Sequence, residues 1–355
     1  MKKRILFVDP VATRQYDDGD LAHGALGGTE ATVLRVAEAL AMDHVVLVAQ
    51  GARQWCRTGP AGVIYSPYRH KSAFLDHSTV DAVVVVRAHK VLPRLRRRFP
   101  GAAMYLWMHC NPGRRLRTLA RICVDTDTTL VAVSDYHLRA MLRFYAAHDP
   151  VSARRLKATR IHNPVAPGLK PDGRAWDRNK LLFLSSPHKG LEQVLDVFTM
   201  LKRRCPSMRL CIANPGYLNW RVPRIEGVFT LGKLRHDEVV NHLRDSLCLF
   251  YPQSTFEETF GLVFAEANAV GTPVLAHPHG AAPEVLNDAA QLCNCEDMAE
   301  VCNRVLRWRE GNRPVPQSME RFELSRVIAD WEQLLSAESR LALCPQAASY
   351  ASARA

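Results

Sequence analysis

The sequence lacks the features that mark a protein of the membrane or of an oxidising compartment. No apolar run approaches the ~20 residues that a membrane-spanning helix needs, and the apolar run near the start, Ile5 to Val8, is too short for a signal peptide. The ten cysteines include no Cys-x-x-Cys pair, and Cys293 and Cys295 form the only close spacing. We therefore expect a cytoplasmic protein with reduced cysteines.

Acidic residues are also in short supply. The chain has 35 Asp and Glu against 47 Lys and Arg, which gives a formal net charge of +12 and a pI near 9.4. This balance indicates an anionic partner, either a phosphorylated substrate, an anionic lipid surface or a nucleic acid, without choosing among them. Seven arginines gather in two stretches of the first half, where they fit a solvated face or a surface for anionic lipid or a phosphorylated acceptor. They are Arg94, Arg96, Arg97, Arg98, Arg114, Arg115 and Arg117.

What the chain has instead is a series of short, continuous apolar runs. Most are followed by a stretch with helical periodicity, such as residues 28–41, where Val33, Val36 and Leu40 share one face. Apolar runs without polar alternation are typical of strands buried on both faces, hence of a parallel sheet between helices. The expected strands are residues 5–9, 45–49, 82–87, 103–109 and 129–134, and then 180–185, 208–214, 228–232, 247–251 and 272–277.

A polar, proline-rich segment at residues 163–179 interrupts this rhythm and is the best linker candidate. We predict an α/β protein with two doubly wound, Rossmann-like domains at residues 1–168 and 169–338, followed by a tail at 339–355. The last helix is assigned to the second domain, with the option of packing back on the first. Ligands bind beyond the carboxyl ends of such strands, so a cleft between the two domains is the expected active site.

The stretch EETFGLVFAE, residues 257–266, places two carboxylates around a glycine. Glu258 falls in a loop between an expected strand and helix, and Glu266 falls about one turn into that helix. Gly261 at the helix start lets the backbone approach a ligand, and the free N–H groups there favour a phosphate. A ligand with a hydroxylated group for each glutamate and a phosphate between the two groups would match this order. A nucleotide sugar is such a ligand.

The segment E-T-F-G-L-V-F-A-E resembles the E-x7-E signature of retaining glycosyltransferases with the two-Rossmann GT-B architecture, specifically family 4. The resemblance covers nearly the whole chain. Four other segments are similar to family elements: GALGGTE (24–30) after the first strand, PHKG (187–190) after the first strand of the second domain, VFTLGKLRHDEV beside the base pocket, and GTPVLAHPHGAAPEVL at the next strand and loop.

The resemblance implies transfer of a sugar from a nucleotide-diphospho-sugar to a hydroxyl acceptor, either a saccharide or a lipid-linked or cell-envelope glycan precursor. The first domain would bind the acceptor and the second the donor. The implied catalytic residues are Glu258 on the sugar hydroxyls, His109 facing the sugar and Lys189 on the departing diphosphate. The implied donor-binding positions are Glu266 on the ribose diol, the amides near Phe260, Gly261 and Leu262, and Ser186, Gly27 and Gly28.

One departure from the family pattern concerns the diphosphate. The family usually has Gly-Arg a few residues before Lys-Gly, whereas Ser185 and Ser186 stand near that place here. Either Ser186 donates a hydroxyl or another cation, such as His188, acts with Lys189. His109 also fits a purely structural histidine nearly as well as a catalytic one.

No acidic metal cage is visible, so we expect no metal and no other cofactor. The Asp-x-Asp at residues 125–127 is interpreted as a polar turn at the amino end of a strand. Two other function classes remain as alternatives. Another GT-B enzyme, such as a nucleotide-sugar epimerase, is disfavoured by the E-x7-E element, and a nucleic-acid-binding protein is supported by charge alone. We expect no specific nucleic-acid partner, and peripheral contact with an anionic membrane remains an option.

Overall fold

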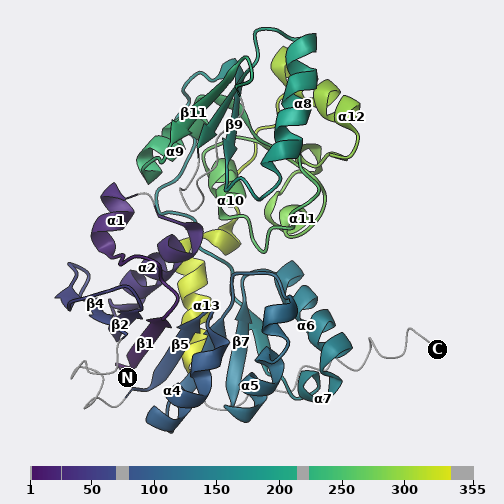
Figure 1. Cartoon of the computed structure of the whole chain (residues 1–355). Helices are drawn as coiled ribbons and strands as arrows, with labels where there is room; N and C mark the ends of the chain where they lie inside the picture. Colours follow the sequence, from purple (N-terminus) through teal and green to yellow (C-terminus); the bar gives the residue numbers. More distant parts are fainter. Residues whose placement is uncertain (1, 25, 69–79, 214–223, 337–355) are drawn as a thin grey trace. The chain divides into compact units, whose positions relative to one another are not determined.

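The computed structural model describes residues 2–24, 26–68, 80–213 and 224–336. The tail expected at 339–355 and the last residue of the strand expected at 208–214 lie outside these residues. Two compact units divide the chain (Figure 1). Unit 1 takes the described residues among 1–18, 32–163 and 324–355, and unit 2 takes those among 19–31 and 164–323.

Unit 1 is built on an eight-stranded sheet with the order β3-β4-β2-β1-β5-β6-β7-β8. Every pair is parallel except β3 with β4. All residues of β5 are buried, as expected for a strand that helices cover on both faces. The strands are β1 (Arg4–Asp9), β2 (Val45–Gln50), β3 (Arg57–Thr58), β4 (Ile64–Pro67), β5 (Ala82–Val86), β6 (Ala103–Trp107), β7 (Thr128–Ala132) and β8 (Ala158–Arg160).

The helices between these strands follow the predicted periodicity. The helix expected at 28–41 forms as α2 (Gly28–Leu40), and it buries Val33, Val36 and Leu40. Ser134 caps the next long helix, because its hydroxyl accepts a hydrogen bond from the N–H of His137. The remaining helices up to residue 163 are α1 (Asp18–His23), η1 (His89–Val91), α4 (Leu92–Arg98), η2 (Arg114–Leu116), α5 (Leu119–Asp125), α6 (Asp135–His148) and α7 (Pro150–Ala153).

The last helix, α13 (Leu324–Ser336), packs against the sheet of unit 1 (Figure 1). Its fully buried Trp331 lies 4.8 Å from the ring of Trp107 and 6.3 Å from the ring of Phe7, measured between centroids. The hydroxyl of Tyr105 donates to the carbonyl of Leu334 at 3.0 Å. The aromatic core of unit 1 therefore includes a helix from the other end of the chain.

Unit 2 contains a five-stranded, fully parallel sheet with the order β11-β10-β9-β12-β13. In Figure 1, α8 and α12 lie side by side, as do α9 and α10. The strands are β9 (Asp177–Leu184), β10 (Arg209–Ala213), β11 (Val228–Gly232), β12 (Ser246–Tyr251) and β13 (Val274–Ala276). The helices are α8 (Leu191–Arg204), α9 (His236–Arg244), α10 (Leu262–Ala269), α11 (Ala282–Val285), η3 (Ala289–Gln291), α12 (Met298–Arg307), η4 (Trp308–Asn312) and η5 (Glu320–Phe322).

The predicted fold class is confirmed in both units. Each of the ten predicted apolar runs overlaps a strand, and the sheets are parallel apart from one edge pair. The short strands β3, β4 and β8 were not predicted. Within the part of the chain that the structure describes, no helix is long and apolar enough to cross a membrane.

Candidate active site

Two of the predicted catalytic residues form an ion pair in unit 2. Lys189 follows β9 and Glu258 follows β12, and these two strands are neighbours in the sheet. The Nζ atom of Lys189 donates to Glu258 Oε1 at 2.9 Å and to Oε2 at 3.0 Å. Their side chains are 26% and 12% exposed, so the pair is only partly shielded from solvent. The structure thus brings the two charges together at the carboxyl edge of the sheet, where ligands of such folds bind.

Tyr251, which the sequence analysis did not single out, is the third member of this cluster. It is the last residue of β12, and its hydroxyl donates to Glu258 Oε1 at 2.9 Å. Its ring is buried and stacks on Phe183 at 5.6 Å between centroids. Burial, and then the negative charge of Glu258, raise the pKa of Tyr251 well above its usual value, so its hydroxyl stays a donor. The same hydroxyl shares a hydrogen bond with Ser185.

The loop between β12 and Glu258 is fixed by a buried glutamine. The Oε1 atom of Gln253 accepts from the N–H groups of Thr255 and Phe256 at 2.9 and 2.8 Å, and its Nε2 donates to the Phe256 carbonyl at 2.8 Å. Gly190, with φ at +80°, packs against Gln253 so closely that a Cβ there would lie 2.6 Å from the Gln253 Cβ. The Nζ atom of Lys189 lies 4.7 Å from the centre of the Phe256 ring. These contacts hold the loops of Lys189 and Glu258 against each other.

A second loop fixes the backbone of Glu258. The Ala281 N–H donates to the Glu258 carbonyl at 2.9 Å. At the preceding residue, Gly280, a Cβ would lie 2.9 Å from both the nitrogen and the carbonyl oxygen of Glu258. The loop after β13 can therefore lie this close to Glu258 only with glycine at position 280.

Helix α10 starts next to Glu258, as predicted. Gly261 is its N-terminal cap, with φ at +79°, and a Cβ there would lie 2.7 Å from the Phe264 ring. The side chain of Phe260 is buried and lies 5.1 Å from the Phe322 ring, so only its backbone is left to meet a ligand. The first two amides of α10, at Leu262 and Val263, precede the first hydrogen bond of the helix, which the Phe264 N–H makes to the Gly261 carbonyl at 2.8 Å. Amides at the start of a helix suit phosphate groups.

Glu266 lies in the second turn of α10 and is buried, with 5% of its surface exposed. Its Oε1 atom lies 3.1 Å from Nε2 of His236, the first residue of α9. His236 stands in the segment that resembles the border of the base pocket, but no sequence pattern indicated a role for His236 itself. The pair places a hydrogen-bonded carboxylate about one turn beyond the start of α10.

Ser186 and His188 are the two candidates for the role that the Gly-Arg of the family has at the diphosphate. Both lie next to Lys189 in the loop after β9. Ser186 is buried, and its carbonyl accepts a hydrogen bond from the Lys189 N–H at 3.0 Å. The His188 ring lies edge-on to Phe256 at 5.8 Å. Both residues therefore belong to the loop that carries Lys189, and His188 and Lys189 contact the same aromatic ring.

The remaining predicted site residues are Gly27, Gly28 and His109. Gly28 lies beside the start of α10, since a Cβ there would be 3.7 Å from Cδ2 of Leu262. Gly27 is buried and its carbonyl accepts from the N–H of Ala31, while Gly28 is the first residue of α2. His109 lies two residues beyond β6 in unit 1, half-buried, with its ring 4.8 Å from that of Trp107.

The electrostatic surroundings of His109 keep its imidazole neutral. Burial, then the positive charge of Arg87 and the neighbouring His137, hold the pKa of His109 well below its usual value. His137 is itself a fixed element: its Nε2 donates to the Cys110 carbonyl at 2.9 Å, and its Nδ1 accepts from the Val133 N–H at 3.3 Å. Burial lowers the pKa of His137 to about 4. No sequence pattern pointed to His137, which anchors the loop that carries His109.

One arginine of the predicted basic surface has a structural role. Arg96 donates through Nε to the Thr126 carbonyl at 2.8 Å and through Nη2 to the Asp127 carbonyl at 3.0 Å. Its Nη1 donates to the carbonyls of Pro100 and Ala102 at 3.1 and 2.8 Å. Arg96 thus ties together the loops that lead into β6 and β7, and its replacement would disturb the fold as well as the surface charge.

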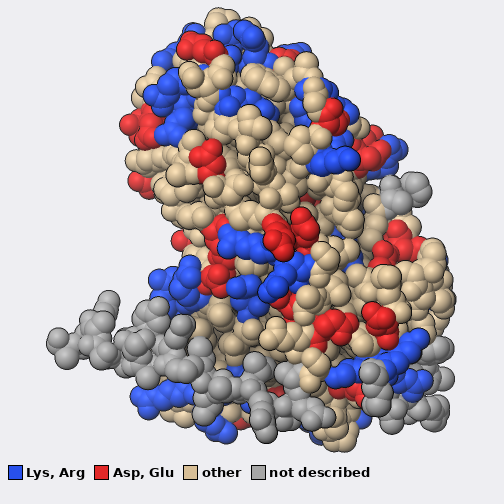
Figure 2. Space-filling view, turned by 180° about the vertical axis from the view of Figure 1, so that it is seen from behind, with Lys and Arg blue, Asp and Glu red and all other residues tan. Residues whose placement is uncertain are grey.

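The other arginines of this group stand at two short helices of unit 1. Arg94, Arg97 and the exposed arginines at 114, 115 and 117 stand on or beside α4 and η2. Figure 2 shows Lys and Arg side chains interspersed with Asp and Glu over the face that it draws. On that face, the basic side chains are mixed with acidic ones over much of the surface.

Comparison of the sequence with known proteins gives two likenesses. Residues 173–322 match the family described as Glycosyl transferases group 1. A curated relative from Corynebacterium glutamicum is 26% identical over 208 residues, which cover 51% of this chain and 52% of the relative. It is described as a GDP-mannose-dependent monoacylated alpha-(1-6)-phosphatidylinositol monomannoside mannosyltransferase. The chain therefore spans about half the length of the curated relative that it matches.

Solved structures extend the likeness to the whole chain. Sucrose-phosphate synthase from Thermosynechococcus elongatus superimposes with a TM-score of 0.66 at 15% identity, covering 94% of this chain and 98% of that one. A UDP-forming α,α-trehalose-phosphate synthase from Burkholderia xenovorans, solved with glucose-6-phosphate, gives a TM-score of 0.65 at 11% identity, covering 94% and 100%. Residues 173–322 thus carry the sequence pattern of the Glycosyl transferases group 1 family, and the chain has the GT-B fold of these structures.

Proposed function

We propose that this protein is a retaining glycosyltransferase of family 4 that moves a sugar from a nucleotide-diphospho-sugar to a hydroxyl acceptor. The observation that carries the proposal is the Lys189–Glu258 pair at the carboxyl edge of unit 2. The pair lies beside the glycine-started helix α10 and within the segment that matches the Glycosyl transferases group 1 family. Cation, carboxylate and free helix amides together suit the charges of a diphospho-sugar.

Each residue has a role that follows from its contacts. Lys189 and Glu258 neutralise each other in the ligand-free protein, and a bound diphosphate would share the ammonium of Lys189. Glu258 would then accept hydrogen bonds from the sugar hydroxyls, with Tyr251 holding its Oε1 atom in place. Glu266, held by His236, would accept from the ribose diol. His109 would contact the sugar as a neutral hydrogen-bonding group.

The transfer step can be written with these residues. The bond between the anomeric carbon and the diphosphate oxygen breaks, and its electron pair leaves with the diphosphate. The acceptor oxygen forms the new bond on the same face of the sugar, and its proton passes to an oxygen of the leaving diphosphate. Lys189 and the amides of α10 would lower the barrier because they stabilise charge as it develops on the leaving group.

Two further observations bear on the acceptor and on the place of action. The Corynebacterium relative is named for a phosphatidylinositol-based acceptor, and the present chain has a net charge of +12. Both suit a lipid-linked acceptor reached by peripheral contact with an anionic membrane. Arg97→Glu, which leaves the structural Arg96 intact, should weaken binding to anionic vesicles, and unchanged binding would remove the membrane from the proposal.

The donor proposal is tested by hydrolysis and transfer assays with UDP-, GDP- and ADP-sugars. Lys189→Met should lower turnover about 10- to 100-fold, because a charge-assisted contact contributes about 1.5–3 kcal/mol. Lys170→Met, an exposed lysine in the linker segment, is the matched control and should keep parental turnover. Near-normal turnover of Lys189→Met would shift the leaving-group role to His188. A parent that turns over none of the donors would contradict the proposal itself.

We also propose that the transfer needs no metal ion, since Lys189 and the amides of α10 can meet the diphosphate charge. The same assays, run with a chelator, should show unchanged turnover. Loss of turnover that Mg²⁺ or Mn²⁺ restores would overturn this part alone.

A further inference from the structure

A strained arginine stands at the carboxyl edge of unit 1. Arg87 directly follows β5 and has φ at +62°, a left-handed conformation that few residues other than glycine adopt. Such a conformation persists only where the surroundings enforce it, and it is commonest at functional sites. A quarter of the Arg87 side chain, 25%, remains exposed. Its charge acts on His109 at the end of the neighbouring strand β6.

The first enforcing contact comes from Asp9, the last residue of β1, which is adjacent to β5 in the sheet. Asp9 is fully buried. Its Oδ2 atom accepts from Arg87 Nη2 at 3.1 Å and from the Tyr16 hydroxyl at 3.0 Å. The carboxylate therefore fixes the direction of the Arg87 guanidinium and is itself fixed by a tyrosine.

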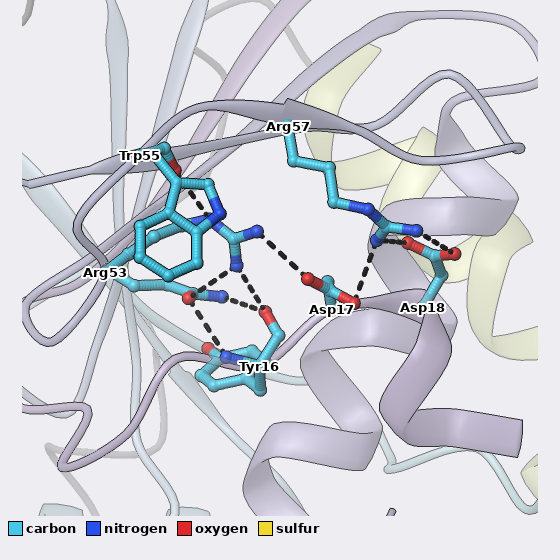
Figure 3. Close-up of polar contacts among 7 residues, drawn as sticks. Tyr16, Asp17, Asp18, Arg53, Trp55 and Arg57 are labelled. Atoms are coloured by element: carbon cyan, nitrogen blue, oxygen red, sulfur yellow. Dashed lines mark hydrogen bonds and ion pairs between the residues drawn. The ribbon is translucent and has the colours of Figure 1, made fainter. Parts of the chain in front are cut away.

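Tyr16 is held in turn by the end of β2. Gln50 lies opposite Asp9 in the parallel register, and both Gln50 and Tyr16 are fully buried. The Tyr16 N–H donates to Gln50 Oε1 at 3.2 Å, and the Tyr16 carbonyl accepts from Gln50 Nε2 at 2.6 Å. The same carbonyl accepts from Nη1 of Arg53 at 3.3 Å (Figure 3).

The network continues through Arg53, whose guanidinium is also buried. Arg53 donates to the Trp55 carbonyl at 3.1 Å and to Asp17 Oδ2 at 2.9 Å, and it lies 5.2 Å from the Tyr65 ring. Figure 3 shows Arg57 beyond it, paired with Asp17 and Asp18 at 2.8 and 2.5 Å. The charges at this end of the network therefore compensate one another.

A gain in folding stability does not by itself explain why this buried network is present. Buried charges lose their hydration, and replacing a buried ionic network by apolar residues is often neutral or stabilising. What such a network does give is a fixed position for the groups that it contacts. Four fully buried polar side chains, those of Asp9, Tyr16, Gln50 and Arg53, lead to a partly exposed cation on the ligand-binding edge of a parallel sheet.

Building on the proposed function, we propose that Arg87 binds a phosphate group of the acceptor and that the network from Asp9 to Arg53 positions it. A guanidinium carries its donors in a rigid fork that matches two phosphate oxygens, and a phosphate brings more negative charge than a carboxylate. His109 beside it is neutral and adds no second charge. The phosphate could belong to a free sugar phosphate or to a phospholipid head group, which have the same chemistry at this position.

The test is calorimetric titration of inorganic phosphate into protein whose donor side is already saturated with nucleoside diphosphate. The parent should bind phosphate, and Arg87→Asn should bind it at least about tenfold more weakly, as expected for the loss of a charge-assisted contact. Asparagine tolerates the left-handed backbone, so the variant adds no strain. Lys157→Gln is the matched control and should bind as the parent does, since Lys157 pairs with Asp127 at 2.6 Å near the opposite, amino edge of the sheet.

A second variant separates binding from folding. In the double variant Asp9→Asn with Arg87→Asn, both charges of the pair are removed, so no unpaired carboxylate stays buried. The melting temperature of this variant should be close to that of the parent, and its phosphate binding should be lost. Arg87→Lys keeps the charge without the fork and should recover part of the affinity. Equal phosphate affinity in the parent and Arg87→Asn, or no phosphate binding in the nucleotide-saturated parent, would overturn the inference.

Two further arms distinguish the sources of the phosphate. Competition by soluble glucose 6-phosphate but not by glucose would indicate a sugar phosphate. Binding to vesicles of phosphatidylinositol in phosphatidylcholine that depends on Arg87 would indicate a lipid head group. Failure of the parent to bind any nucleoside diphosphate would instead contradict the proposed function, and it is measured first.

Discussion

The carboxyl edges of the two sheets carry ion pairs of different kinds. In unit 2, Lys189 and Glu258 are partly exposed and lie on loops that follow neighbouring strands. In unit 1, Asp9 pairs with Arg87 and Arg53 pairs with Asp17. One member of each pair, Asp9 or Arg53, is fully buried and binds several partners at once. A partly exposed pair can exchange one partner for a ligand at little cost, whereas a buried pair holds its geometry. The difference indicates that unit 2 offers exchangeable charges to a ligand and that unit 1 presents a fixed one.

The two edges also differ in which residues adopt a positive φ angle. The site loops of unit 2 use glycine wherever φ is positive, at Gly190, Gly261 and Gly280, and at each of them a side chain would collide with a neighbour. Unit 1 uses Arg87 in the equivalent conformation at the end of β5. Glycine allows close approach of backbone to backbone or ligand. An arginine in that conformation instead needs outside support, which Asp9 provides.

The largest effect should come from breaking the buried network of unit 1. Arg53→Met removes one of the two cations that pair with Asp17, and it removes the buried charged donor of the Tyr16 and Trp55 carbonyls. Loss of these charge-assisted contacts together should lower the free energy of unfolding by about 3–5 kcal/mol. Urea unfolding, followed by hydrogen exchange of β1 and β2, measures this change. Lys157→Met breaks a partly exposed pair and should cost under about 1 kcal/mol. If both variants lose a similar amount of unfolding free energy, buried and exposed ion pairs do not differ in this protein as described above.

The exchangeable pair should matter for turnover instead. Glu258→Gln should lower kcat by roughly two to three orders of magnitude, because its proposed role puts the carboxylate where positive charge develops on the sugar. Affinity for free nucleoside diphosphate should stay within about twofold, since that ligand lacks the sugar. The exposed neighbour Glu257→Gln is the matched control for steady-state kinetics and calorimetry. If Glu258→Gln loses nucleotide affinity and keeps kcat, the assignment of the two glutamates is reversed.

Acid should weaken unit 1 through His137. Its pKa is about 4 in the folded protein against about 6.5 in an unfolded chain, so the unfolded state binds more protons between these values. Stability is therefore complete above pH 6.5 and falls by about 3 kcal/mol as the pH drops to 4. The lowered pKa of His109 acts in the same direction. Urea unfolding of the parent and His137→Gln at several pH values should show a flatter profile for the variant.

The control for this profile is His148→Gln, an exposed histidine on the same helix α6. It should leave the pH dependence as it is in the parent. A parent whose stability is the same at pH 6.5 and pH 4 would contradict a buried, neutral His137.

The smallest effect concerns Glu266, which the structure places in contact with His236. Glu266→Gln should weaken binding of the donor and of free nucleoside diphosphate alike, by about tenfold, because a ribose diol is the same in ground and transition states. His236→Gln keeps a hydrogen-bonding group near Glu266, so it should weaken the binding of both ligands less than Glu266→Gln does. Calorimetry with the nucleotide measures both variants. A drop in kcat with unchanged nucleotide affinity would move Glu266 from the ribose to the reacting sugar.

Much of the architecture could be predicted because buried parallel strands leave a local mark. Continuous apolar runs predicted ten of the described strands, and the glycine of E-x7-E correctly predicted the start of α10. The strands β3, β4 and β8 are two to four residues long and only partly buried, so they leave no comparable run. The contacts of α13 with unit 1 depend on packing between distant segments, which the periodicity of one helix cannot specify.

The site was predictable only in part for a related reason. Lys189 and Glu258 stand in segments with a local signature, but their pairing with each other and with Tyr251 appears only in three dimensions. Tyr251 at the end of an apolar strand reads as one more core residue. The role of Arg96 was equally hidden, because its partners are backbone carbonyls up to 31 residues away.

The position of α13 also fixes the order in which the two units can be completed during synthesis. Unit 2 has all its described residues once the ribosome passes residue 323, whereas unit 1 still lacks Trp331, which joins Trp107 and Phe7 in its core. The half of the protein that is made first is therefore finished last. A fragment that ends at residue 163 would expose this aromatic face in water, and we expect it to aggregate unless a peptide of residues 324–336 is supplied alongside.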